Sequence, residues 1–228
     1  MTDTAPRTLH AIRFPGESPQ YRAARDRLLE AEIALRRQIE TVAAQRRALP
    51  PGGLVPQDYA FDGEAGPVKL SELFGGHDVL LLYGFMLGPD MERACPACTS
   101  IIDALDGEMK HIRQQAAIAV VARSPLPRFV DHARERGWRD TRLLSSAGTS
   151  FHRDYHAEDP QGRQRPILNV FQRGHGEIRH VWATELAFTP ADPGQGPRHV
   201  DLIWPLWGVL DLSPRGRGDA FVPKLSYD

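Results

Sequence analysis

The chain opens with one long amphipathic pattern between residues 18 and 50. Apolar residues recur there every seven positions, at Tyr21, Leu28, Leu35, Val42 and Leu49. This spacing places the apolar side chains along one stripe of an α-helix. Ser18 is a favourable N-cap, Pro19 suits the first helical position, and Pro50 ends the pattern. The stripe either pairs with a second copy in a homodimer or packs across the chain's own domain.

From residue 53 onward the pattern becomes that of a mixed α/β domain. Strands are predicted at residues 59–61, 68–70, 78–83, 117–121 and 142–144. Helices are predicted at residues 95–115 and from Ser124 with Pro125 to Gly137. A long loop, residues 84–94, precedes the first of these helices. Because strands and helices alternate, we expect parallel strands joined by right-handed crossovers.

The C-terminal half is predicted to hold a hairpin and a last helix. Residues 145–165 read as an irregular polar stretch with solvated histidines, and Pro166 then stands at the entrance of a strand. The hairpin strands are expected at residues 167–172 and 177–184, and an apolar helix kinked at Pro205 at residues 199–212. The chain is therefore divided into residues 1–52, a lead-in with the long helix, and residues 53–228.

The composition of the chain argues against nucleic-acid and membrane partners. Lys and Arg total 28 against 29 Asp and Glu in 228 residues, which gives no field to attract nucleic acid or an anionic membrane. The apolar run at 79–82 is far shorter than the roughly 20 residues that span a bilayer. Residues 1–14 lack the apolar core of a signal peptide, and the chain has two cysteines. We expect a cytoplasmic protein with no nucleic-acid or membrane partner.

The candidate chemistry lies in Cys95-Pro96-Ala97-Cys98, which follows the buried strand and opens a helix. Unpaired N–H groups and the dipole at a helix start stabilise a thiolate. Such a pair can exchange between dithiol and disulfide, with Cys95 attacking and Cys98 resolving. Tyr83, Asp90 and Glu92 flank the approach to Cys95 and are candidate modulators of its proton affinity.

The element order resembles the thioredoxin fold, a central mixed sheet flanked by helices, here with an added N-terminal helix. By that resemblance Pro166 matches the cis-proline that faces the active-site cysteines. Arg165 stands where Thr or Val usually precedes that proline, which would put a cation near a thiolate. The resemblance thus implies a substrate groove formed by Pro96, Arg165 and Pro166.

A closer resemblance covers almost the whole chain. It rests on Arg46 to Pro50, Tyr59 to Gly63, Phe85 to Asp90, the C-P-A-C motif, Asp106-Gly107 and Leu210 to Gly216. These segments resemble the bacterial thioredoxin-like family called domain of unknown function 899, within the thioredoxin/peroxiredoxin-like superfamily. The resemblance implies the fold and brings no reaction with it.

Three functions compete for the two cysteines. The first is a thiol-disulfide oxidoreductase whose partner is a protein or small-molecule disulfide or thiol. The second is a peroxiredoxin-like peroxidase, in which Cys98 would attack and Cys95 would resolve. The third is a non-enzymatic copper or zinc module that would also use histidines, from His152, His156, His175, His180 and His199. We favour the first, assign no metal site, and expect no bound organic cofactor.

Overall fold

The chain forms two compact units in the computed structural model, which describes residues 9–218 and 221–227. The units are Met1–Pro50 and Pro51–Asp228. The first contains helix α1, Pro19–Arg47, and the second contains every strand and the remaining helices of the described residues. We describe each unit by itself.

Helix α1 begins as predicted. Its N-cap Ser18 accepts a hydrogen bond from the Tyr21 N–H at 3.1 Å, and Pro19 occupies the first turn. Arg22 forms ion pairs with Glu17 and Asp26 at 3.4 and 3.0 Å, and the three side chains are largely buried. Large apolar side chains along the helix and just beyond it remain between 53% and 62% exposed: Tyr21, Leu28, Leu35, Ile39 and Leu49.

The second unit is built on one eight-stranded sheet with the order β1-β8-β7-β4-β5-β6-β2-β3. The strands are β1 (Gly53–Leu54), β2 (Ala60–Gly63), β3 (Gly66–Lys69), β4 (Val79–Phe85), β5 (Ala117–Ala122), β6 (Leu143–Ser145), β7 (Ile167–Gly174) and β8 (Glu177–Ala183). Strands β4, β5 and β6 are parallel, and the hairpin β7–β8 runs antiparallel to β4. Strand β4 therefore lies at the centre, between a parallel and an antiparallel neighbour.

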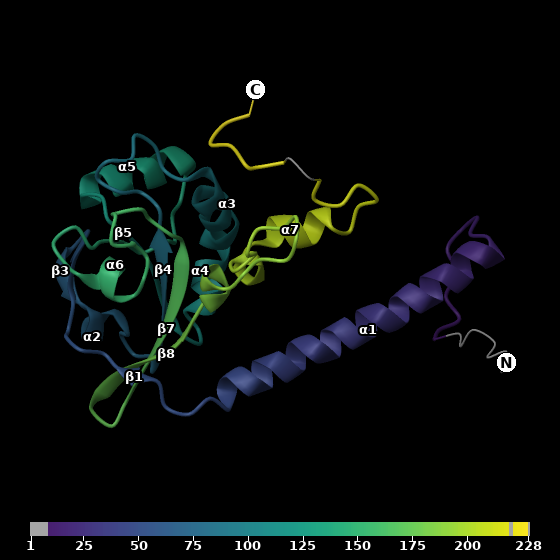
Figure 1. The fold of residues 1–228 in the computed structure, drawn as a ribbon, viewed down its shortest axis with the longest axis horizontal. Coiled ribbons are helices and arrows are strands. Elements are labelled where there is room, and N and C mark those ends of the chain that lie inside the picture. Colours follow the sequence, from purple (N-terminus) through teal and green to yellow (C-terminus); the bar gives the residue numbers. More distant parts are fainter. Residues whose placement is uncertain (1–8, 219–220, 228) are drawn as a thin grey trace. The chain divides into compact units, whose positions relative to one another are not determined.

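Helices cover both faces of this sheet (Figure 1). They are α2 (Leu70–Leu73), α3 (Pro96–Leu105), α4 (Met109–Ile112), α5 (Leu126–Arg136), α6 (Phe151–Asp154) and α7 (Pro205–Leu210), with short 3₁₀ turns η1 (Asp106–Glu108), η2 (Glu185–Phe188) and η3 (Asp201–Ile203). One core cluster joins residues of α3, α4 and α5 to one sheet face, and another joins residues of α2 and α6 to the other.

The two cores follow from the alternation of side chains along each strand. On β4, Tyr83 and Phe85 belong to the same cluster as Cys98, whereas Leu80 and Leu82 belong to the cluster with Phe151. Strand β5 is buried along its whole length, as expected for a parallel strand covered on both faces. Cys98 is therefore part of one specific buried layer.

The predicted thioredoxin-like fold is confirmed by the topology: central β4, the cysteine-headed α3, parallel β5 and the antiparallel hairpin β7–β8 follow one another. Several local predictions were wrong. The helix expected over 95–115 ends at Leu105 and resumes as η1 and α4, and Pro205 begins α7 instead of kinking a longer helix. Strand β1, which pairs with β8, was not predicted.

The stretch 145–165 departs furthest from expectation. It contains α6, and Phe151, His152 and Ala157 within it are 1% exposed. Phe151 and Tyr155, four residues apart, pack their rings 4.9 Å apart against the core. Phe151 and Tyr155 have the spacing of neighbours on one helix face, but the polar residues between them made the stretch look like a solvated loop in the sequence. This stretch therefore forms part of the layer opposite Cys98.

Candidate active site

The cysteine pair is placed by the end of β4 and the start of α3. Cys95 is the N-cap of α3, with extended backbone angles of φ −64° and ψ 123°, and Pro96 takes the first helical position. The Cys95 N–H donates to the carbonyl oxygen of Met86 at 3.0 Å, and the Thr99 N–H donates to the Cys95 carbonyl at 2.9 Å. A proline in the first turn costs no hydrogen bond, because the N–H groups of that turn have no partner within the helix. Pro96 therefore favours a helix that starts directly after Cys95.

The two thiols are free and lie 3.7 Å apart. The pKa of Cys95 is lowered to about 6, first by a hydrogen bond from the Cys98 thiol, against an opposing effect of burial. The backbone N–H groups of Cys98 and Ala97 lower the pKa of Cys95 further. Cys95 is partly exposed. At neutral pH it is therefore an accessible thiolate.

Cys98 has the opposite character. It is fully buried, and burial raises the pKa of its thiol well above the usual value, as do the hydrogen bond and the charge of Cys95. The buried Tyr83 hydroxyl interacts with Cys98 and lowers the pKa of that thiol, as does the Met86 backbone. The pKa of Tyr83 is raised by burial first and then by the charge of Cys98. Tyr83, predicted as a modulator of Cys95, is thus among the groups that shift the pKa of Cys98 and not among those that shift the pKa of Cys95.

The loop before Cys95 is held by Arg128 of α5, a residue that the sequence had not singled out. Its guanidinium donates to the carbonyl oxygens of Gly88 and Glu92, each at 3.0 Å, and also to that of Met91. Guanidinium N–H groups in a fixed fork suit several carbonyl acceptors at once. Arg128 therefore fixes the backbone that leads into the cysteine helix.

The same helix reaches the other side of Cys95 through His132. The Thr99 hydroxyl donates to the Cys95 carbonyl oxygen at 3.0 Å, and His132 Nε2 lies 3.1 Å from the same hydroxyl oxygen. Because the hydroxyl proton is used, His132 donates through Nε2. Burial, followed by the charge of Arg136, lowers the pKa of His132. Arg128 and His132 are four residues apart, a spacing that could have marked one helix face.

The remaining predicted site residues lie as follows. Asp90 and Glu92 are exposed in the loop, and neither is among the groups that shift the pKa of Cys95. Pro166 directly precedes β7, where Ile167 pairs with Gly84, and its carbonyl oxygen lies 2.9 Å from His199 Nε2. The Arg165–Pro166 peptide bond is trans, so the cis bond implied by the resemblance was wrong. Arg165 instead places its guanidinium 5.0 Å from the centre of the Phe188 ring.

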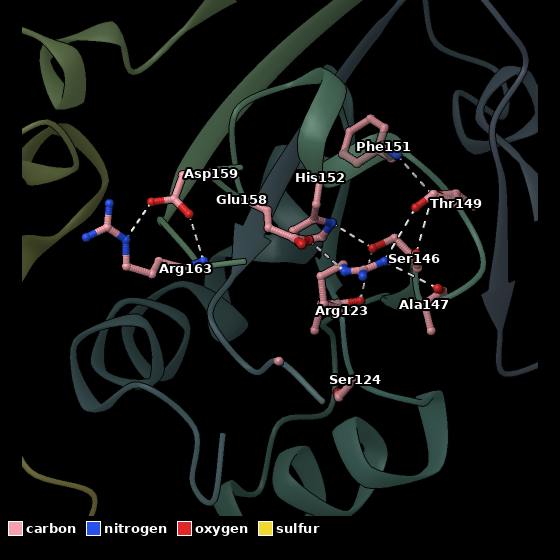
Figure 2. Close-up of polar contacts among 12 residues, drawn as sticks. Arg123, Ser124, Ser146, Ala147, Thr149, Phe151, His152, Glu158, Asp159 and Arg163 are labelled. Atoms are coloured by element: carbon pink, nitrogen blue, oxygen red, sulfur yellow. Dashed lines mark hydrogen bonds and ion pairs between the residues drawn. The ribbon is translucent and has the colours of Figure 1, made fainter. Parts of the chain in front are cut away.

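The histidines considered as metal ligands include His152. His152, expected to be solvated, is 1% exposed, and its Nδ1 lies 2.6 Å from the Ser146 hydroxyl oxygen (Figure 2). Burial first, then the charge of Arg123, lowers the pKa of His152 to about 3. Within residues 9–218 and 221–227, no three His, Cys, Asp or Glu side chains are grouped as metal ligands would be.

The fold and the paired thiols at the start of α3 define a thioredoxin-like protein. The chain belongs to the family described as "Bacterial protein of unknown function (DUF899)", whose model matches residues 12–227. No curated protein matches the chain. None of the helices in the described part of the chain combines the length and apolar character needed to cross a membrane.

Among solved structures, the chain is similar to a cysteine-to-serine mutant of PrxQ from Xylella fastidiosa, with 12% identity and a TM-score of 0.47 over 59% of this chain and 84% of that one. It is similar to a cysteine-to-serine mutant of peroxiredoxin Q from Xanthomonas campestris, with 15% identity and a TM-score of 0.46 over 69% and 96%. A hypothetical protein from Sinorhizobium meliloti 1021 has 20% identity and a TM-score of 0.44 over 77% and 91%.

Proposed function

We propose that this protein is a thiol-disulfide oxidoreductase in which Cys95 attacks and Cys98 resolves. The observation that carries the proposal is the contrast between two neighbouring thiols. Cys95 is partly exposed with a pKa of about 6, whereas Cys98 is fully buried with a raised pKa. A nucleophilic thiol must be accessible and ionised, and its resolving partner need only reach it.

In the first step the Cys95 thiolate attacks one sulfur of a partner disulfide. A bond forms between the Cys95 sulfur and that sulfur, the partner's own S–S bond breaks, and the second partner sulfur leaves as a thiolate that takes up a proton. The negative charge on Cys95 is lost at this point. After burial, the hydrogen bond with Cys95 and the charge of Cys95 are the largest causes of the raised pKa of Cys98. Both are weakened when the mixed disulfide forms, so Cys98 ionises more easily.

In the second step Cys98 loses its proton and attacks the Cys95 sulfur. The Cys95–Cys98 disulfide forms, and the remaining partner sulfur leaves and accepts a proton. The Tyr83 hydroxyl, which lowers the pKa of Cys98, supports the charge that develops on this buried sulfur. In sum, two protein thiols are oxidised and one partner disulfide is reduced to two thiols. A cellular dithiol reductant would return the protein to its starting state.

The proposed partner is a protein or small-molecule disulfide, and the proposed compartment is the reducing cytoplasm. Cytoplasmic glutathione and thioredoxin keep thiols reduced, which suits a protein whose only cysteines work as a dithiol. The groove expected around Pro96, Arg165 and Pro166 stays a prediction, and the Arg165 guanidinium lies over the Phe188 ring. The groove is consistent with the position of Pro96 next to Cys95 in the first turn of α3.

The proposal is tested with oxidised glutathione and mass spectrometry on the whole protein. Cys98→Ser should accumulate a mixed disulfide between Cys95 and glutathione, whereas the wild type should release it as the internal disulfide forms. Cys95→Ser, the matched control, should trap nothing. Absence of the mixed disulfide in Cys98→Ser, together with a Cys95 pKa near the usual value of about 8.5, would overturn the proposal.

The peroxidase alternative makes a different demand on the same pair. It requires Cys98 to attack peroxide, and the burial and raised pKa of Cys98 oppose that role. Peroxide consumption by Cys95→Ser and Cys98→Ser separates the two reactions. Consumption that survives loss of Cys95 and disappears on loss of Cys98 would favour the peroxidase.

A further inference from the structure

The second unit has two adjoining hollows that contain neither cysteine. The first, of about 570 Å³, is lined among others by Arg153, Arg165 and Phe188. The second, of about 510 Å³, is lined among others by Ile167 and Asn169. His156 and Phe188 line both. Each volume is in the range of small-molecule sites.

These hollows lie on the sheet face opposite Cys98. On β7, Leu168 belongs to the core cluster of Cys98, and Ile167 and Asn169 on either side of it point to the other face. The pairing of β7 with β4 agrees, because Leu168 is opposite Tyr83 and Ile167 is opposite Gly84. A ligand in the hollows would therefore not occupy the thiol site.

Two cationic side chains that line the first hollow, Arg153 and Arg165, could bind a ligand. The acidic residues of this hollow are already matched, Glu158 by Arg123 at 2.8 Å and Asp159 by Arg163 at 2.7 Å (Figure 2). In the part of the chain that the structure describes, Arg153 and Arg165 form no ion pair, although, against the effect of burial, the charge of Arg153 helps to lower the pKa of Asp154, which lines the second hollow with Glu185. The Arg165 guanidinium lies over the Phe188 ring, which holds this cation against an apolar surface.

The second hollow adds a buried amide. Asn169 is 1% exposed, and its Oδ1 lies 2.9 Å from His180 Nε2. Its Nδ2 has no hydrogen-bond partner among the described residues. A buried donor without an acceptor is costly, and an acceptor supplied by a ligand would remove that cost. Phe188, which is 45% exposed, provides an apolar surface common to both hollows.

We propose that the two hollows form a binding site for a small organic acid. The carboxylate of this ligand would meet Arg153 and Arg165, its flat apolar body would lie against Phe188, and a carbonyl acceptor would face Asn169. Guanidinium groups bind carboxylates through paired, charge-assisted hydrogen bonds, which favours a carboxylate over a neutral ligand. The site is independent of the thiol chemistry proposed for the opposite face.

The test uses calorimetry and ligand-observed NMR on the intact protein with three matched probes. These are para-acetylbenzoate, para-acetylbenzamide, which lacks the charge, and para-isopropylbenzoate, which lacks the acceptor. We expect the acid to bind at least about tenfold more tightly than the amide because charge-assisted bonds are lost. Loss of the acceptor should weaken binding by about fivefold.

Variants test whether para-acetylbenzoate binds in the two hollows. Arg165→Gln and Phe188→Ala should each weaken binding of para-acetylbenzoate by about tenfold. Phe221→Ala is the matched control, because Phe221 is 43% exposed and lies against Trp207, and Arg215→Gln is the control for charge. Both controls should bind as the wild type does. Cys95→Ser should also bind normally, which separates this site from the thiol site.

Three results would overturn the proposal. They are the absence of saturable binding of both acids at millimolar concentration, equal binding of the acid and the amide, and undiminished binding by Arg165→Gln. Equal binding of the two acids would overturn the assignment of Asn169 as the donor.

Discussion

The guanidinium of Arg128 donates a hydrogen bond of 3.0 Å to the carbonyl oxygen of Gly88, across from α5 to the loop that ends at Cys95. The same group also binds the carbonyls of Met91 and Glu92. One side chain thus satisfies several carbonyls of an irregular segment that has no strand partner. The position of Cys95 depends on that segment through the Met86 carbonyl.

Arg128→Met should loosen the loop and destabilise the protein by about 1.5–3 kcal/mol, the usual cost of hydrogen bonds to a charged group. Arg128→Lys should recover only part of the loss, because an ammonium cannot reach several carbonyls as a fork does. Urea unfolding measures the stability, and limited proteolysis reports cleavage within residues 86–94. Arg134→Met, on the same helix and paired with Asp131 at the surface, should change stability by at most about 0.5 kcal/mol. Equal effects of the Arg128→Met and Arg134→Met variants would contradict the assigned role.

Cys95 should react with iodoacetamide along a pH profile whose midpoint is near 6. The Cys98 thiol is the largest cause of the low pKa, so Cys98→Ala should move the midpoint upward. Cys98→Ser keeps an O–H donor and should leave the midpoint lower than Cys98→Ala does. If the Ser and Ala variants share one midpoint, the hydrogen bond from position 98 is not what stabilises the thiolate.

The low pKa of Cys95 also predicts how the stability of the reduced protein depends on pH. Because the folded pKa is about 6 and the unfolded pKa is about 8.5, the unfolded chain binds more protons between these values. Cys95 therefore contributes stability that is fully present above the unfolded pKa and is lost as pH falls toward 6. Unfolding of wild type and Cys95→Ser across this window should show a difference that shrinks with falling pH.

Asp106 is expected to support the end of the cysteine helix. Its carboxylate accepts hydrogen bonds from the N–H groups of Arg139, Asp140 and Thr141 and from the Thr141 hydroxyl. Asp106→Asn should cost about 1–3 kcal/mol at neutral pH. The pKa of Asp106 is lowered, against burial, by the Thr141 hydroxyl and these N–H groups, so its contribution should be lost as pH falls below the unfolded value of about 4.

Unfolding at neutral and acidic pH measures this loss. Asp131→Asn is the matched control, because Asp131 is exposed and forms its ion pair with Arg134 at the surface. A penalty for Asp106→Asn that stayed constant down to strongly acidic pH would contradict a role for the ionised carboxylate.

The apolar stripe of α1 remains exposed in the structure, and a homodimer through this stripe stays a prediction. Leu28 and Leu35 are 53% and 62% exposed, one heptad apart, and such spacing suits helix pairing. Leu28→Glu with Leu35→Glu should convert a dimer into a monomer, as measured by light scattering after size-exclusion chromatography. Arg36→Glu with Arg37→Glu, off the stripe, is the control. A wild-type protein that is monomeric at all concentrations would favour packing of the stripe within one chain.

The cysteines, the helix start and the central strands were predictable because each has a local pattern. Ser18 with Pro19 specifies a helix start, and β4 and β5 are continuous apolar runs. The contacts of Arg128 were not predictable, because a guanidinium that binds carbonyl oxygens has no spacing rule, and its spacing from His132 marks only a shared helix face. His152 was misjudged because its neighbours in sequence are polar, whereas its surroundings in space are Ser146 and the Phe151 ring.

Arg128 and His132 lie one turn apart on α5, and they reach the two chain segments that meet at Cys95. Helix α5 therefore contacts both the loop before Cys95 and the first turn of α3 after it. Because Arg128 and His132 bind the segments on either side of Cys95, we expect a substitution on α5 that displaces both side chains to change the reactivity of Cys95 without contacting its sulfur.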